Sequence, residues 1–299
     1  METNVLVWGE GRMTTFNQLQ LVLFDANDIS GLIALSDSVG WDYDESEIRT
    51  VMMSGKIFGH KNAVGKIVSS AAIITYDSNL ASIGMVIVHE NYRGLGLGKL
   101  ATQKCIESVS EHTEIMLVAT KDGEPMYAKM GFTTVDYVHK YLIDNYVGAY
   151  NLTSNDYTIE NFNERDFADI VSLDAAAFGD KRSNFLRNRI KQSKQCIVVK
   201  DYDANIIGFG LSILGPINLI LGPIIAPDSK TASLIINILA KDHNGKLRID
   251  VPYGHAEFIQ WIEQSGFTEA NKPPVMILHA EKMPIRNNTL YAIAAQIFG

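Results

Sequence analysis

Residues 83–101 read IGMVIVHENYRGLGLGKLA, and this stretch decides the fold. It opens with an apolar, β-branched run from Ile83 to Val88, which predicts a buried strand. Glycines follow at positions 94, 96 and 98, and apolar residues then recur at helical spacing from Leu97 to Val109. The predicted order is strand, glycine turn, helix. Because the first amides of a helix lack intrahelical partners, glycines before them leave an anion-binding site open.

The glycine spacing separates three kinds of anion site. The phosphate-binding loop of nucleotide hydrolases needs G-x-x-x-x-G-K-[ST], but Arg93 stands at its first glycine and Leu100 at its hydroxyl position. A dinucleotide-binding loop needs G-x-G-x-x-G, whereas these glycines run G-x-G-x-G, which disfavours a dinucleotide oxidoreductase. What remains is R-x-x-G-x-G, from Arg93 to Gly98, following a strand and Tyr92.

This motif resembles the acetyl-CoA signature of the GNAT superfamily of N-acetyltransferases. A second motif supports the resemblance: in EPMYAKMGF, Tyr127 stands four residues before the pair Gly131-Phe132, as in the family. A strand is expected between the two motifs, from Glu114 to Thr120. For the rest of the N-terminal half the resemblance implies a first strand at Phe16–Phe24, two helices to about Met53, and strands near Gly55–His60 and Lys66–Tyr76.

Length and composition limit the class of protein. A chain of 299 residues with 46% hydrophobic content can bury a large core in one or two domains. The net charge of −8 and the absence of a basic run argue against a nucleic-acid partner. The amino terminus shows no signal peptide, and the apolar runs are too short for a membrane span, so we expect a cytoplasmic enzyme. Cys105 and Cys196 are expected as reduced, buried thiols, and nothing in the sequence fixes the oligomeric state.

The chain also contains an internal repeat. An offset near 138 residues lays Asp28 over Asp166 and Leu35 over Leu173, and a similar offset lays Gly131-Phe132 over Gly266-Phe267. We therefore predict two tandem GNAT-like lobes of α/β (α+β) class, each with a mixed, mostly antiparallel sheet flanked by helices. The predicted domains are residues 1–145, which bind acetyl-CoA, and residues 156–299.

The second lobe is predicted to be degenerate. Lys230 replaces Arg93, and Thr231, Ser233 and Ile235 fall where the glycines stand, so side chains should crowd the amides. Ile262 falls where Tyr127 stands. The role of this lobe is left open between covering the acceptor site and supplying interface area. Helical spacing of apolar residues in the tail, 288–299, predicts a C-terminal helix that docks onto a lobe.

The resemblance implies acetyl-CoA as cofactor and no metal. It places the pantetheine arm along the strand at Val86, Ile87 and Val88, where a main-chain N–H polarises the thioester carbonyl. It places the pyrophosphate on the loop that consists of Arg93, Gly94, Leu95, Gly96, Leu97, Gly98 and Lys99.

For the chemistry, the family motif makes Tyr127 the expected general acid, with a core aromatic as the alternative. Candidates for the base by residue type are His60, His89 and Glu90. The connection between the first two helices holds Trp41, Asp42, Tyr43 and Asp44, together with Glu45 and Glu47. These acids and aromatics either receive a cationic amine or form a solvated helix start capped by Asp44.

Two classes of function remain open besides the disfavoured oxidoreductase. The first is acetylation of a primary amine of a small molecule, with protein lysine or N-terminal acetylation as its variant. The second is a non-catalytic acyl-CoA sensor. Intact glycines together with Tyr127 favour catalysis, because a sensor needs only the glycines.

Overall fold

The N-terminal half contains the strands and helices that its periodicity and its resemblance to the GNAT family predict, although residues 16–18 of the predicted first strand lie outside the described residues. The structure is a computed structural model that describes residues 19–148 and 157–299. The strands of this half are β1 (Gln20–Leu23), β2 (Gly55–Lys61), β3 (Ile67–Thr75), β4 (Leu80–Val88), β5 (Glu114–Val118) and β6 (Thr133–Ile143). Its helices are α1 (Ile29–Asp37), α2 (Glu45–Ser54), α3 (Leu97–Glu107) and α4 (Glu124–Lys129), with short 3-10 turns η1 (Ala26–Asp28) and η2 (Glu90–Tyr92).

The C-terminal half repeats this order. Its strands are β7 (Thr158–Asn161), β8 (Gln195–Lys200), β9 (Ile206–Leu214), β10 (Leu219–Ile225), β11 (Leu247–Pro252), β12 (Thr268–Asn271), β13 (Pro274–Leu278) and β14 (Leu290–Ala292). Its helices are η3 (Glu164–Asp166), α5 (Phe167–Phe178), α6 (Ser183–Gln192), α7 (Ser229–Ala240) and α8 (Ala256–Gln264).

Hydrogen bonds confirm the repeat. Phe132 N donates to the Tyr127 carbonyl over 3.1 Å, and Phe267 N donates to the Ile262 carbonyl over 3.2 Å. Gly131 and Gly266 adopt left-handed φ angles of 96° and 92°, which favour glycine. The two helix ends are therefore the same structural device, and Ile262 occupies the position of Tyr127.

The two lobes share one sheet because they exchange strands. The order of the strands along the sheet is β1-β2-β3-β4-β5-β13-β6-β11-β10-β9-β8-β7. Thus β13, from the C-terminal half, lies between β5 and β6 and completes the sheet of the N-terminal lobe. In return the second half of β6, from Val138 to Ile143, pairs with β11 of the C-terminal half. The division of the chain at 145 and 156 stays a prediction, and in space residues 274–278 lie in the first lobe's sheet.

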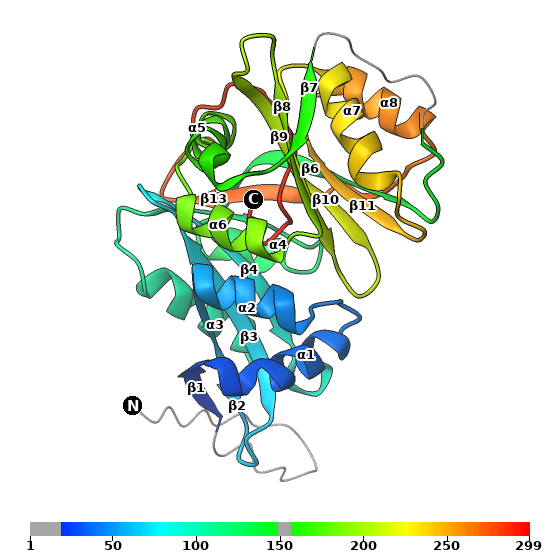
Figure 1. Cartoon of the computed structure of the whole chain (residues 1–299). Coiled ribbons are helices and arrows are strands. Elements are labelled where there is room, and N and C mark those ends of the chain that lie inside the picture. Colours follow the sequence, from blue (N-terminus) through cyan, green and yellow to red (C-terminus); the bar gives the residue numbers. More distant parts are fainter. Residues whose placement is uncertain (1–18, 149–156) are drawn as a thin grey trace.

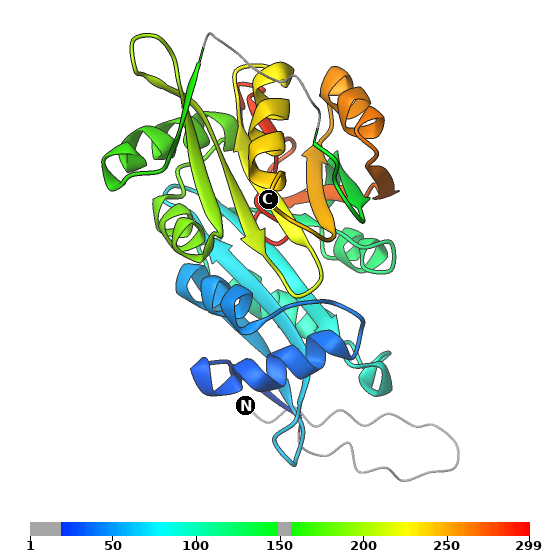
Figure 2. The same cartoon turned by 45° about the vertical axis from the view of Figure 1, so that its right-hand side comes forward.

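Helices cover both faces of this sheet (Figures 1 and 2). In the N-terminal lobe, α1 and α2 lie on one face, and α3 and α4 pack on the other around buried Ala101, Cys105 and Tyr127. In the C-terminal lobe, α5 and α6 lie on the same face as α1 and α2, and α7 and α8 cover the opposite face. The face that carries α2 and α6 therefore runs across both lobes.

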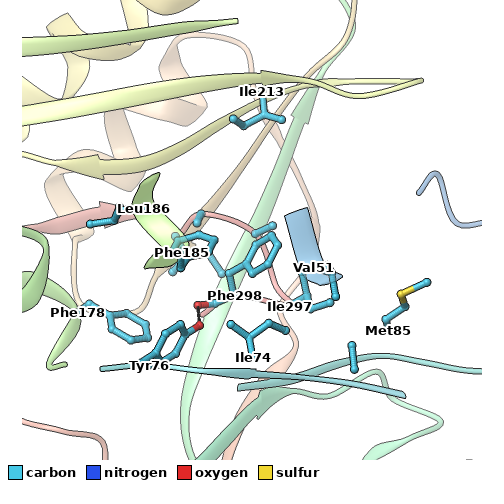
Figure 3. Close-up of a cluster of buried hydrophobic side chains, with 14 of the residues drawn as sticks. Val51, Ile74, Tyr76, Met85, Phe178, Phe185, Leu186, Ile213, Ile297 and Phe298 are labelled. Carbon is cyan, nitrogen blue, oxygen red and sulfur yellow. Dashed lines mark hydrogen bonds between the residues drawn. The ribbon is translucent and has the colours of Figure 1, made fainter. Parts of the chain in front are cut away.

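The predicted C-terminal helix is wrong. Residues 290–292 form strand β14, which pairs antiparallel with β10, and the chain then turns into the core. The apolar spacing misleads because nearly every residue from Leu290 to Phe298 is buried, so the segment has no polar face. Figure 3 shows Ile297 and Phe298 among side chains of both lobes, including Tyr76 and Phe185. The tail thus fills the junction between the lobes.

The structure also bears on the two cysteines and on the question of a membrane-spanning helix. Both cysteines are free and buried, and burial raises the pKa of Cys105 above its usual range and that of Cys196 to about 12. None of the helices within residues 19–148 and 157–299 has the length and apolar character that a membrane span requires.

Candidate active site

The C-terminal part of β4 leaves its neighbour strand. β4 pairs in parallel with β5 only from Leu80 to Ile83, although β4 continues to Val88. A bulge lies at this point, because Met85 has a left-handed φ of 52° and the register with β3 shifts. The Ser70 hydroxyl donates to the Met85 carbonyl over 2.8 Å and holds the bulge in place. Among the described residues, no strand pairs with the β5-facing edge of β4 from Gly84 to Val88.

The glycine loop next to this edge leads into an uncapped helix. Gly96 is the N-cap residue of α3, has a φ of 74°, and provides no side chain to accept from the first amides. A Cβ atom at Gly94 or Gly96 would meet nothing within 4 Å, so the space beside these two glycines is open. A Cβ at Gly98 would lie 3.3 Å from Val88, which explains a glycine there by close packing. The loop is therefore a cradle that side chains leave empty, at the positive end of a helix.

The other predicted cofactor residues surround this cradle. Arg93 and Lys99 are exposed, and Leu97 is buried under α3. The backbone of Leu95 lies in the loop, and Ile87 is buried on the side of the sheet that carries α2. The side chains of Val86 and Val88 lie on the α3 side, within 3.9 Å of the Cβ position of Gly98. The structure thus gathers all of the predicted cofactor residues around one strand edge and one helix start.

Tyr127 lies on α4, next to the same edge. Its ring is buried and contacts Phe132 edge-on, with ring centroids 5.8 Å apart. No hydrogen-bond partner for its hydroxyl is found within residues 19–148 and 157–299. Burial, and then the nearby Cys105, raise the pKa of Tyr127, so the hydroxyl stays protonated. The Tyr127 hydroxyl is therefore a hydrogen-bond donor that none of the described residues engages.

The histidine and acidic candidates for a base have local structural roles. The Nδ1 atom of His60 lies 2.7 Å from the Ser69 hydroxyl, and burial lowers the pKa of His60. His89 is the N-cap of η2, where its Nδ1 accepts from Asn91 N over 3.3 Å. Glu90 is exposed in η2. None of these contacts points to proton abstraction at β4.

The predicted acceptor segment between α1 and α2 is partly explained by helix capping. Asp44 is the N-cap of α2, and its carboxylate accepts from Glu47 N over 2.7 Å. Glu47 in turn forms an ion pair with the buried Arg189 of α6. Trp41 and Tyr43 are half-buried, with ring centroids 6.2 Å apart.

Asp42 is different from its neighbours. It is half-buried and makes no ion pair or hydrogen bond with any residue that the structure describes. The segment therefore keeps one unpaired carboxylate, at Asp42, whereas Asp44 and Glu47 hold structural contacts.

Sequence reasoning missed a group of polar residues, one from the N-terminal half and three from the C-terminal half, that the shared sheet brings to this place. The residues are Lys140 on β6, Arg248 and Asp250 on β11, and Gln296 in the tail. Arg248 Nε donates to Asp250 over 2.8 Å, and Gln296 Nε2 donates to the other oxygen over 2.9 Å. No sequence signal marks them, because the exchange of strands is what places β6 beside β11.

The repeat of this site in the second lobe is closed. The segment aligned with the glycine loop already belongs to α7, so the loop is missing and not merely crowded by side chains as predicted. Asp228 caps α7, and its carboxylate accepts from Thr231 N over 2.7 Å. The edge of β10 that corresponds to the free edge of β4 is paired with β14 at Ile224 and Ile225. The second lobe therefore fills both parts of its site with its own chain.

A surface hollow lies away from the glycine loop. A hollow of about 360 Å³ is lined by residues of β1, α2 and β2, such as Leu23, Met53 and Lys56, and by none of the glycine loop. In the described ranges, no group of three or more His, Cys, Asp or Glu side chains is arranged to hold a metal ion.

Both halves match models of one family. Residues 41–140 match a family model described as an acetyltransferase (GNAT) domain, and residues 170–292 match a second model with the same description. The chain is 38% identical over 281 residues to YitH of Bacillus subtilis, which is named an uncharacterized N-acetyltransferase. That match covers 94% of this chain and 98% of the relative.

Solved structures share the two-lobed fold. A putative acetyltransferase from Pyrococcus horikoshii superposes with a TM-score of 0.77 at 17% identity, covering 98% of this chain and 99% of that one. A tandem GNAT protein from the clavulanic acid biosynthesis pathway superposes with a TM-score of 0.64 at 13% identity. That alignment covers 89% of this chain and 100% of the other. At these identities the likeness concerns the fold.

Proposed function

The chain belongs to the GCN5-related N-acetyltransferase (GNAT) family, and we propose that its N-terminal lobe transfers the acetyl group of acetyl-CoA to a primary amine of a small molecule. The observation that carries the proposal is the uncapped N-terminus of α3 beside the unpaired edge of β4. The C-terminal lobe, whose corresponding surfaces are filled, is the non-catalytic partner.

The residues present fit acetyl-CoA. The open space at Gly94 and Gly96 suits a pyrophosphate, because no side chain approaches these glycines and the unpaired amides of a helix start attract anions. Arg93 and Lys99 add positive charge around the loop. The free edge at residues 86–88 suits the amides of the pantetheine arm, which would hydrogen bond as a strand does.

We propose that the protein positions the thioester, polarises its carbonyl group and donates a proton to the departing sulfur. When bound, acetyl-CoA supplies a thioester whose carbonyl carbon accepts the amine. A main-chain N–H between Val86 and Val88 would polarise the carbonyl, as preorganised donors do in acyl transfer. The protonated Tyr127 would donate a hydrogen bond to the departing sulfur. Between an ordinary tyrosine, with a pKa near 10, and a thiol, with a pKa near 8.5, complete proton transfer costs about 2 kcal/mol. The raised pKa of Tyr127 adds to this cost, so we propose a hydrogen bond to the sulfur whose proton transfer completes only as the thiolate leaves.

The acceptor must lose its charge before it reacts. A lysine-like amine has a pKa near 10.4, and its neutral form costs about 4.6 kcal/mol at pH 7. Asp42 and the half-buried aromatics Trp41 and Tyr43 are the residues of the α1–α2 connection that we propose receive the amine. Asp44 acts there as the helix cap.

Two measurements on the purified protein test the proposal. Calorimetry with acetyl-CoA should show one site per chain, and a thiol-release assay across a panel of small amines should show turnover. One cofactor per chain with no turnover of any amine would instead support an acyl-CoA sensor. Turnover only with peptides would support the protein-acetylating variant. No binding of acetyl-CoA would overturn both.

A further inference from the structure

The strand exchange between the lobes gathers charged side chains on one face of the shared sheet. Lys140 on β6 stands directly opposite Asp250 on β11, and Arg248 lies two residues before Asp250. Directly paired residues, and residues two apart in a strand, share one face. That face also carries the tail, because Gln296 donates to Asp250.

The tail connects this group to the free edge of β4. Ile297, which follows Gln296, packs on Gly84, where a Cβ atom would lie 2.6 Å from its side chain. Ser82 of β4 donates to the Ile297 carbonyl over 2.8 Å. Two consecutive residues of the tail, Gln296 and Ile297, therefore connect the polar group with the point where β4 leaves β5. The α1–α2 connection approaches from the other side, and Figures 1 and 2 show it beside the tip of the β9–β10 hairpin.

The charges in this group do not cancel. The two oxygens of Asp250 are already engaged, one by Arg248 and one by Gln296, and the Asp250 side chain is fully buried. Lys140 is half-buried and forms no ion pair with any described residue. Arg248 uses only its Nε, and its side chain keeps 14% of its surface exposed. Two cations against one saturated carboxylate leave one net positive charge.

The electrostatics of Lys140 agree with this count. Burial lowers the pKa of Lys140, the Arg248 guanidinium lowers it further, and the carboxylates of Asp250 and Asp42 oppose these effects. The carboxylate of Asp250 and, to a smaller extent, that of Asp42 raise the pKa of Arg248. The α1–α2 connection, which carries Asp42, lies beside the β9–β10 hairpin (Figures 1 and 2). Lys140, the terminal nitrogens of Arg248 and the unpaired carboxylate of Asp42 thus lie in one neighbourhood.

We infer that Lys140 and Arg248 bind a carboxylate of the acceptor, so that the acceptor is a small amino acid whose ammonium approaches Asp42. The inference rests on the proposed function, since it names the substrate class of that site. One net positive charge matches the single negative charge of a carboxylate and not the two of a phosphate monoester. Asp42 matches the ammonium group, and the site is neutral overall with a zwitterion bound. The second lobe then has a specific task, because it supplies Arg248.

The experiment compares amino acids with their carboxamides as acceptors at saturating acetyl-CoA. Each pair differs only in the anionic group, and the amide's amine is less basic, so basicity alone would favour the amide. We expect kcat/KM to favour the acids by about tenfold to a hundredfold, the scale of a hydrogen bond to a charged group. Equal values for acids and amides would overturn the inference and leave acetyl transfer intact.

Variants at position 140 test whether Lys140 causes the preference for acids over amides. K140Q should raise KM for acids by about tenfold or more and leave amides unchanged, whereas K140R should retain the preference. Lys241→Gln, an exposed lysine at the end of α7, is the charge-matched control and should change nothing. A loss by K140Q that is equal for acids and amides would overturn the inference. Because Lys140 has no ion pair, its replacement leaves no buried charge unpaired.

Binding measurements separate this inference from the proposed function. If acetyl-CoA binds but no amine is turned over, calorimetric titration with the same acids and amides decides the inference directly. Selective binding of acids that K140Q abolishes would support the carboxylate site even in a sensor. Absence of binding would overturn it. The cofactor titration alone reports on the glycine loop.

Discussion

The N-termini of α3 and α7 occupy equivalent places in the two lobes and are built in opposite ways. α3 begins after a glycine loop, at Gly96, which has no side chain to cap it. Only three residues separate the end of β10 from the start of α7, and the carboxylate of the last of them, Asp228, caps the helix. Four unpaired amides at a helix start must find partners. In α7 a side chain of the protein is one of those partners, and in α3 we propose that a ligand phosphate takes this role.

The strand edges beside these helices show the same contrast. β4 leaves β5 after Ile83, and its edge stays free among the described residues. β10 leaves β11 after Leu221, and β14 takes the place of a partner at Ile224 and Ile225. In the second lobe, the places that correspond to the open site are therefore occupied by protein atoms, and the lobe keeps its fold. The filled lobe supplies the pattern of contacts that a ligand would make in the open one.

The contrast between Tyr127 and Ile262 gives the largest expected effect. Tyr127→Phe should lower kcat by about tenfold to 10⁴-fold, because proton donation contributes on this scale and the ring is retained. Acetyl-CoA affinity should not change, since the phosphates are bound by the loop. The measurement is steady-state thiol release with a good acceptor, together with calorimetry.

Tyr253→Phe is the matched control for this change. Tyr253 lies in the second lobe and is 62% exposed, so loss of its hydroxyl should leave kcat at the wild-type value. An undiminished kcat for Tyr127→Phe would show that solvent protonates the thiolate and that Tyr127 only fills the core, as the buried Ile262 does in the second lobe.

The aligned basic residues Arg93 and Lys230 give the next effect. Arg93→Ala should weaken acetyl-CoA by about 1.5–3 kcal/mol, the contribution of a charged hydrogen bond. Acetyl-pantetheine, which lacks the phosphates, should bind equally well to both proteins. Lys230→Ala removes an exposed charge from the second lobe and should leave both affinities unchanged. An equal loss for the two ligands would mean that Arg93 does not contact phosphate.

Local signals predicted the elements of the open site well. The apolar run before Gly94 and the periodicity after Gly96 are short-range patterns, and β4 and α3 form where they indicate. The Gly-Phe pairs fixed the alignment of Tyr127 with Ile262, because a left-handed residue at a helix end needs glycine. These features depend on residues within a few positions of one another.

The features that the sequence did not predict depend on contacts between residues that are far apart in the sequence. Nothing in Pro274–Leu278 indicates that it pairs with β5 of the other half, since an apolar strand fits any buried position in a sheet. The tail was predicted to be helical because its alternative, pairing with β10, involves residues far away in the sequence. Lys140 and Arg248 come together only through these pairings.

The helix caps give the smallest and most direct test of the comparison. Asp228→Ala should destabilise the protein by about 1 kcal/mol, or about 2 °C in Tm, because the Thr231 amide loses its acceptor. Asp44→Ala removes the same 2.7 Å cap from α2 and calibrates the loss of stability. Calorimetry with acetyl-CoA should still give one site per Asp228→Ala chain, since β14 continues to occupy the edge of β10. A second binding site in this variant would show that the cap alone closes the lobe. An unchanged count would show that a GNAT lobe binds its cofactor only when helix start and strand edge are both free.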